Sequence, residues 1–126
     1  MTVLLVLIGG MIGAPARYLT DRFVQVRHDS VFPWGTFVVN VTGSFALGAL
    51  VVLAFDRWPR SRYLRPFLGV GVLGGFTTFS TYVLDVRTLV ADERMGLAAV
   101  YLVATLLVGL AAAWLGMVAA RWVDNR

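Results

Sequence analysis

The sequence contains no cysteine and no lysine, and it has few charged residues of any kind. Without cysteine, neither a disulfide framework nor a thiolate metal site is available. Charged residues make up 14% of the 126 residues, and the mean hydropathy is +0.79. A soluble domain of this length needs more charge than this to cover its surface. The composition therefore predicts a protein that lies in a membrane.

The positive charge is carried by eleven arginines, which face seven acidic residues and leave a net charge of +4. In a soluble protein this balance would suggest a nucleic-acid partner. Here the arginines stand at the ends of apolar runs, which is where membrane proteins keep their charged residues. We therefore expect membrane lipid, and no nucleic acid, around this chain.

Four apolar runs are long enough to cross a bilayer, which takes about 20 helical residues. They cover approximately residues 2–19, 34–55, 64–89 and 96–120, and the first connection is expected from Thr20 to Phe32. The runs exhaust the chain, so we predict a single all-α transmembrane domain over residues 1–126. Since the connections are short, consecutive helices should pack as antiparallel neighbours. So small a bundle leaves little room for an internal pathway, and a transport route is expected at a subunit interface.

The distribution of arginines gives almost no preference for one orientation. With four spans, the N-terminus, the second connection and the C-terminus share one side of the membrane. That side has six arginines and the other has five. One interpretation is a fixed orientation set by details that this count misses. The other is insertion in both orientations, with the chain pairing antiparallel with itself like an inverted repeat made of separate chains.

The second span contains a polar stripe. Thr36, Asn40 and Ser44 recur every four residues and therefore share one helix face. Hydroxyls and small residues at this spacing are typical of interhelical packing in membranes. Asn40 favours a functional role, because a carboxamide at mid-depth supplies two donors and is rarely placed there for packing.

The third span has an unusual centre. Gly71 and Gly75 form a small-residue pair that should bring two backbones close. Residues 74–82, with the sequence Gly-Gly-Phe-Thr-Thr-Phe-Ser-Thr-Tyr, combine two weak helix formers with four hydroxyls, and we expect the helix to break there. Non-helical backbone at membrane depth survives only when it is buried or lines a polar cavity. Its free carbonyls could hold a cation where two chains meet.

Aromatic and hydroxyl side chains continue this pattern. Phe79 and Tyr82 are three residues apart and should project from one face. Aromatic residues in such a position usually pack in a core, but here hydroxyls are interleaved with them. In the fourth span Tyr101, Thr105 and Gly109 recur every four residues. By itself this stripe indicates a packing seam, and beside the third span it could be part of a polar track.

The chemistry that the sequence lacks points to a passive pathway. No acidic residue lies deep in a span, since Asp85 falls near an end, so a proton-coupled exporter is disfavoured. No phosphate-binding glycine loop, nucleophile with a base, or metal-ligand cluster is present, and we predict that the chain is not an enzyme. The donors of Asn40, Ser80, Thr81 and Thr105, with Arg17 near a mouth, favour an anion. The residues alone do not choose among halides.

The chain resembles the Fluc family of fluoride channels, also called CrcB, over essentially its whole length. Gly-x-x-x-Arg occurs at residues 13–17, Gly-Thr-Phe-x-x-Asn-x-x-Gly-Ser at 35–44, and Tyr-x-x-x-Thr at 101–105. The most specific match is Gly-Gly-x-Thr-Thr-Phe-Ser-Thr followed by an aromatic residue, at 74–82. The resemblance implies a passive, fluoride-selective channel that exports fluoride from the cytoplasm across the inner (plasma) membrane and lowers its toxicity.

The resemblance also implies an assembly and a set of site residues. It implies an antiparallel, dual-topology homodimer whose third helix is broken at mid-membrane, with two pores at the dimer interface. A structural sodium ion would be held there by the backbone carbonyls of Gly74 and Thr77 of each subunit. The implied fluoride pathway consists of Asn40, Phe79, Tyr82, Ser80, Thr81, Tyr101, Thr105 and Arg17.

Two positions depart from the pattern, and three alternatives stay open. The family commonly has phenylalanine at the position of Tyr82 and serine at that of Thr105. Some family members require a sister subunit, although the near-even arginine count favours a homodimer. A small dual-topology multidrug exporter has a similar length, but it needs a glutamate in its first span, and residues 1–17 contain no acid. A purely structural membrane subunit would share the packing seams but would not need Asn40 opposite a hydroxyl-rich helix break.

Overall fold

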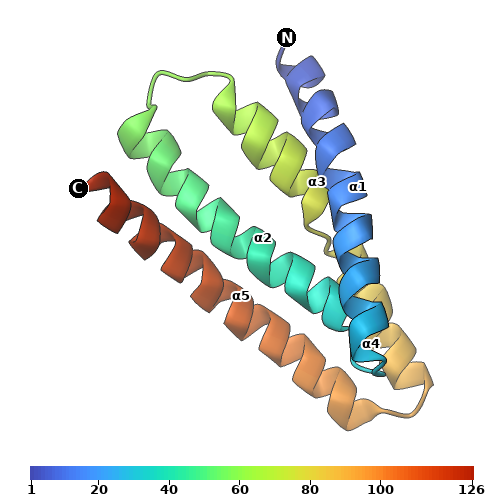
Figure 1. Ribbon diagram of the computed structural model, residues 1–126. Coiled ribbons are helices and arrows are strands. Elements are labelled where there is room, and N and C mark those ends of the chain that lie inside the picture. The colour runs from blue at the N-terminus through green and yellow to red at the C-terminus, as the bar shows by residue number, and fades with distance from the viewer.

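The computed structural model describes residues 1–126, and the chain is helical throughout (Figure 1). The helical elements, which include the π-helical segments η1 and η2, are α1 (Thr2–His28), α2 (Trp34–Val52), η1 (Leu53–Arg57), η2 (Arg65–Leu73), α3 (Gly74–Phe76), α4 (Ser80–Ala91) and α5 (Met95–Asp124). Four stretches are long and apolar enough to cross a membrane, and they are Thr2–His28, Trp34–Arg57, Arg65–Ala91 and Met95–Asp124. The predicted all-helical chain with four membrane-crossing stretches is confirmed.

The first helix is longer than the sequence pattern predicted. α1 continues to His28, so most of the connection expected from Thr20 to Phe32 is helical. No glycine or proline occurs between residues 16 and 28, so nothing in this stretch stops the helix. The true connection is a short turn. The side chain of Gln25, near the end of α1, donates to the Ser30 carbonyl of this turn at 2.9 Å and accepts from the Gly35 amide of α2 at 3.3 Å.

Glycines bring two pairs of helices into backbone contact. α1 packs along η2, where a Cβ atom on Gly71 would lie 2.9 Å from the Cα atom of Gly9. A Cβ on Gly75 would lie 3.2 Å from the Ala14 amide nitrogen, so the predicted role of Gly71 and Gly75 in close packing is confirmed. α2 packs along α5, and a Cβ on Gly48 would collide with the backbone of Ala113. Any larger residue at these positions would push the helices apart.

The buried core is small and lies near the end of the molecule where α4 meets α5. It consists of Tyr82, Leu89, Ala98 and Tyr101, with Phe32 packed against it. Large apolar side chains elsewhere are exposed, for example Leu107 at 63% and Leu110 at 71%. A soluble protein rarely exposes so much apolar surface. These faces therefore suit contact with acyl chains or with other transmembrane helices.

Candidate functional site

Regular helix is interrupted inside the third apolar stretch. α3 ends at Phe76, Thr77 is extended with φ −81° and ψ 158°, and α4 begins at Ser80. Gly74 and Gly75 are poor helix formers, and the hydroxyl side chains that follow compete for backbone hydrogen bonds. Residues 77–79 therefore lie outside both helices.

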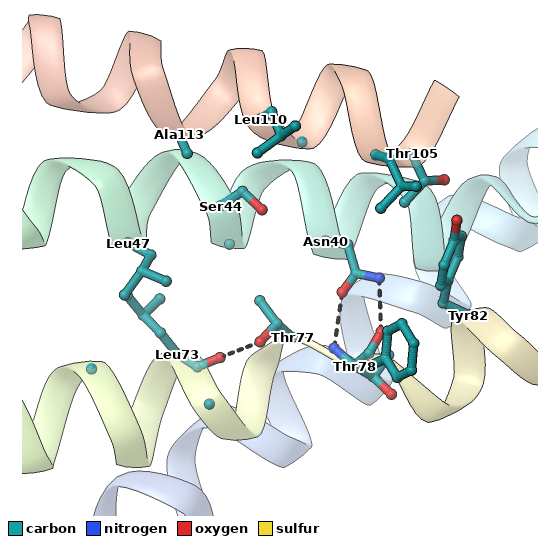
Figure 2. Close-up of a pocket in the computed structure, with 16 residues that line it drawn as sticks. Asn40, Ser44, Leu47, Leu73, Thr77, Thr78, Tyr82, Thr105, Leu110 and Ala113 are labelled. Atoms are coloured by element: carbon teal, nitrogen blue, oxygen red, sulfur yellow. Dashed lines mark hydrogen bonds between the residues drawn. The ribbon is translucent and has the colours of Figure 1, made fainter. Parts of the chain in front are cut away.

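The Asn40 side chain on α2 holds this segment at two points (Figure 2). Its Nδ2 donates to the Thr78 carbonyl at 2.8 Å, and its Oδ1 accepts from the Thr78 amide at 2.9 Å. Because Thr78 offers one backbone donor and one acceptor, the orientation of the carboxamide is determined. The second N–H of Asn40 remains available to a ligand.

Two backbone amides bind side chains instead of the carbonyls that they would meet in a continuous helix. The Thr78 amide donates to Asn40 and not to the Gly74 carbonyl. The Thr81 amide donates to the Thr78 hydroxyl at 3.2 Å and not to the Thr77 carbonyl. The carbonyl oxygens of Gly74 and Thr77 therefore lack their helical donors and can accept another partner. They belong to the residues that the sequence resemblance assigns to a cation.

An open groove of about 400 Å³ lies beside the non-helical segment, between α2, the third stretch and α5 (Figure 2). None of the side chains that line it is charged, and its polar groups are one carboxamide and several hydroxyls. The lining residues are Asn40, Gly43, Ser44, Leu47, Gly69, Leu73, Gly74, Thr77, Thr78, Phe79, Tyr82, Thr105, Leu106, Gly109, Leu110 and Ala113. The groove therefore offers hydrogen-bond donors in an otherwise apolar setting.

The two aromatic residues of the third stretch both line the groove but differ in exposure. Phe79 is 75% exposed, whereas Tyr82 is buried. Their ring centroids are 5.9 Å apart, as expected for aromatics on one face. The Tyr82 hydroxyl donates to the Leu102 carbonyl of α5 at 2.6 Å. The extra hydroxyl at this position is therefore already bonded to the backbone of α5.

The Thr105 hydroxyl is buried and has no hydrogen-bond partner in the chain. Buried hydroxyls are normally paired, because an unpaired one loses its contacts with water without replacement. Thr105 is also one of the residues that line the groove, and an unpaired buried hydroxyl beside a groove is a candidate ligand-binding group.

Half of the eight predicted pathway residues come together in the groove, namely Asn40, Phe79, Tyr82 and Thr105. Ser80 is exposed and lies outside the groove lining. Arg17 and Thr81 line a second cavity of about 180 Å³ between α1, α2 and the start of α4. Thr78 lines both spaces and stands between them.

Tyr101 lies in the core and not in the groove. It is fully buried, its ring packs edge-on against Phe32 at 5.3 Å between centroids, and its hydroxyl donates to Asp85 at 3.0 Å. Tyr101 can therefore influence the groove only indirectly, through Tyr82, whose ring centroid is 5.3 Å from that of Tyr101.

Sequence reasoning missed two residues with central contacts. Thr78 makes both backbone hydrogen bonds to Asn40. In the sequence, however, nothing distinguishes it from the neighbouring hydroxyl residues. The sequence pattern places Asp85 near an end of a span, yet Asp85 accepts a hydrogen bond from the Tyr101 hydroxyl. The spacing of four residues from Thr81 to Asp85, which puts both on one helix face, was the available signal.

Comparison with known proteins identifies the family. The profile of the family "CrcB-like protein, Camphor Resistance (CrcB)" matches residues 4–117. The chain belongs to the CrcB family. A relative from Nocardia farcinica, named fluoride-specific ion channel FluC 2, is 51% identical over 123 residues, which cover 98% of this chain and 87% of the relative. A relative from Streptomyces avermitilis, named FluC 1, is 45% identical over 93% of this chain and 94% of its own length.

Family membership confirms three of the predictions made from sequence. The motif-based resemblance to Fluc proteins is correct. A third relative, from Rhodospirillum centenum, is 46% identical over 115 residues, covers 91% of each chain and is also named a fluoride-specific ion channel. The family is thus one of ion channels and not of enzymes. With its four apolar helices, this member is a multi-pass membrane protein.

Proposed function

We propose that this chain is a passive, fluoride-selective ion channel that exports fluoride from the cytoplasm across the inner (plasma) membrane and thereby lowers its toxicity. The observation that carries the proposal is 51% identity, over 98% of the chain, to a relative named a fluoride-specific ion channel. The groove is the part of the molecule that suits this function.

Fluoride is small and strongly hydrated, so a pathway must supply many donors in place of the lost water. Asn40 and Thr105 both line the groove, and the second N–H of Asn40 and the unpaired hydroxyl of Thr105 are proposed as two such donors. The edge of the Phe79 ring, which carries partial positive charge, is a third electropositive group. The absence of a charged side chain from the groove also favours conduction, because a fixed positive charge would slow the release of the ion.

The proposed channel is an antiparallel, dual-topology homodimer. The groove is open along one side, and Phe79 is 75% exposed in it, so a second copy would complete the wall. Six arginines on one side of the membrane and five on the other are compatible with insertion in both orientations. Because a two-fold axis makes two equivalent grooves, the dimer would have two pores.

The interruption at residues 77–79 is proposed to lie at mid-membrane, where the two copies meet and a structural sodium ion binds. The Gly74 and Thr77 carbonyls lack their helical donors, and backbone carbonyls of this kind can replace the water around a monovalent cation. A sodium ion coordinated by carbonyl oxygens of both subunits would hold the two copies together. Thr78, held by Asn40, keeps these carbonyls in place.

The other predicted residues are assigned to the ends of the pathway. Thr81 and Arg17 line the second cavity, which we propose is a vestibule where arginine attracts the anion. Ser80, being exposed on α4, would contribute its hydroxyl where the partner closes the groove. Tyr101 would act by supporting the ring of Tyr82.

The proposal is tested by fluoride efflux from liposomes that contain the purified protein and a potassium ionophore. A fluoride electrode should record rapid, electrogenic efflux, and chloride should not follow. Efflux no faster than from empty liposomes would refute the proposed function.

The aromatic in the groove is tested with Phe79→Ile, which removes the ring edge but keeps an apolar side chain. We expect the variant to lose fluoride efflux while the protein stays folded and dimeric by size-exclusion chromatography. Phe23→Ile is the matched control, because Phe23 is exposed on α1 outside the groove, and it should keep its activity. Full activity in Phe79→Ile would exclude this ring from the pathway.

A further inference from the structure

All of the net positive charge lies at one end of the molecule. This arginine-rich end contains the start of α1, the connection between η1 and η2, and the end of α5, which lie at the same end of the bundle in Figure 1. The opposite end has five arginines and five acids and is neutral. The arginine-rich end has six arginines and only two acids, namely Arg57, Arg60, Arg62, Arg65, Arg121, Arg126, Asp56 and Asp124.

Five of these six arginines have no anionic partner in the chain. Arg57 forms the single salt bridge of the molecule, with Asp124 at 3.3 Å. The Arg65 guanidinium lies over the Phe55 ring at 4.1 Å, and that of Arg62 lies 5.6 Å from the Tyr63 ring centroid. Arg60 has neither a hydrogen bond nor an aromatic contact. The excess positive charge is therefore available to an external anion.

Arg60, Arg62 and Arg65 line one pocket of about 410 Å³, together with Ser61. The pocket also includes Val70 of η2, which is 62% exposed and lies further along the span. The pocket is thus strongly basic and has an apolar edge at Val70. A ligand that fits it has an anionic head joined to an apolar part.

Aromatic residues indicate the depth of this pocket in the membrane. Trp58 and Tyr63 flank it in sequence, and Trp122 lies at the neighbouring end of α5; all three residues are about half exposed. Tryptophan and tyrosine gather at the level of lipid headgroups. The pocket therefore lies where lipid phosphates are found.

We propose that this arginine pocket binds the phosphate group of an anionic phospholipid, whose acyl chains lie along the exposed apolar side chains of η2 and α1. Arginine binds phosphate through paired N–H donors, and basic clusters next to a membrane span attract anionic lipid. The inference rests on charge, pocket shape and membrane depth, and it does not depend on which ion the protein conducts.

Native mass spectrometry of the full-length protein tests the proposal. The protein is mixed with phosphatidylglycerol and phosphatidylcholine of identical acyl chains, and the bound lipid is counted. Phosphatidylglycerol should be retained roughly tenfold better, since each basic side chain near an anionic surface contributes measurably to binding. Arg60→Gln/Arg62→Gln should abolish this preference. Arg22→Gln/Arg27→Gln, which removes the same charge from the opposite end, should keep it.

A single variant and a soluble anion complete the test. Arg60→Gln removes a side chain without a partner in the chain, so it should fold normally and reduce the preference by about threefold.

Inorganic phosphate should raise the melting temperature less than phosphatidylglycerol does. The proposal is overturned by equal retention of both lipids, by an unchanged preference in the double glutamine variant, or by an equal thermal shift with inorganic phosphate, which would indicate a site for a free anion. If the double glutamine variant lost its dimer with or without lipid, these arginines would be binding acidic residues of a second copy. That result would also overturn the lipid proposal.

Discussion

Two hydroxyls near the groove differ in whether they already have a partner. The Tyr82 hydroxyl donates to a carbonyl of α5, whereas the Thr105 hydroxyl is buried without a bond. The first is therefore expected to contribute to stability and the second to ligand binding. Substitutions that remove only the hydroxyl separate these roles.

Thr105→Val keeps the shape of the side chain and removes its hydroxyl. A hydrogen bond to a charged group contributes about 1.5–3 kcal/mol. Its loss in the conducting state should therefore lower fluoride efflux roughly ten- to a hundredfold. The melting temperature should hardly change, because no bond within the chain is lost. Thr105→Ser retains the hydroxyl and should keep most of the efflux. Equal rates in the valine and serine variants would contradict this role.

Tyr82→Phe removes the bond to the Leu102 carbonyl and leaves the ring in place. We expect a loss of about 1 kcal/mol in the free energy of unfolding, the typical contribution of such a bond. Fluoride efflux should stay within about twofold of the original rate, since the hydroxyl is already bonded to the Leu102 carbonyl and does not have to serve the ion. Thermal unfolding and liposome efflux measure the two effects. A large loss of efflux without loss of stability would mean that the hydroxyl takes part in conduction.

At the scale of elements, the central feature is an exchange of hydrogen bonds between α2 and the third stretch. Asn40 forms hydrogen bonds with the amide and the carbonyl of Thr78. The carbonyls of Gly74 and Thr77 therefore lack the amide donors that they would have in a continuous helix. One side chain on α2 thus stabilises non-helical backbone on another element. An apolar side chain in its place would leave the Thr78 amide free to return to the Gly74 carbonyl.

Asn40→Leu tests the link between this exchange and the proposed sodium ion. For the original protein, replacing sodium by choline should lower the melting temperature, because ligand binding stabilises the folded state. The variant should lose both fluoride efflux and this dependence on sodium. Thr42→Val is the control and should retain both, because Thr42 lies on α2 outside the groove lining and its hydroxyl bonds only to carbonyls of its own helix. A sodium-dependent melting temperature in Asn40→Leu would separate Asn40 from the cation site.

At the scale of the whole molecule, the arginine distribution bears on how the chain is oriented in the membrane. The sequence has no cysteine, so one cysteine can be introduced at either end as the only reactive thiol. Ser30→Cys lies in the first connection and Asn125→Cys at the opposite end, after α5.

Labelling of intact cells with a membrane-impermeant maleimide measures this orientation. If the chain inserts both ways, about half of the protein should be labelled at each position, since the arginine counts on the two sides are almost equal. After permeabilisation, both variants should react fully. Complete labelling at one position and none at the other would show a single orientation and would contradict the antiparallel homodimer.

Much of the architecture could be read from local pattern. Long apolar runs bounded by arginine predict the four membrane-crossing stretches, and the small residues at 71 and 75 predict the close approach of two backbones. The end of the first helix was misjudged, because charged residues after Leu19 mark the membrane boundary but do not stop a helix. Length, hydropathy and glycine spacing are properties of a few neighbouring residues, which is why sequence reveals them.

The partners of polar groups depended on contacts between distant residues. Asn40 and Thr78 are 38 residues apart, and Tyr82 reaches a carbonyl 20 residues away. Tyr101 and Thr105 occupy one stripe of α5, yet one hydroxyl binds Asp85 and the other binds nothing. A helical repeat assigns side chains to a face but does not say which atoms of the next helix they meet. Only the packing of α2, α4 and α5 against one another decided which donors are already bonded and which remain free for an ion.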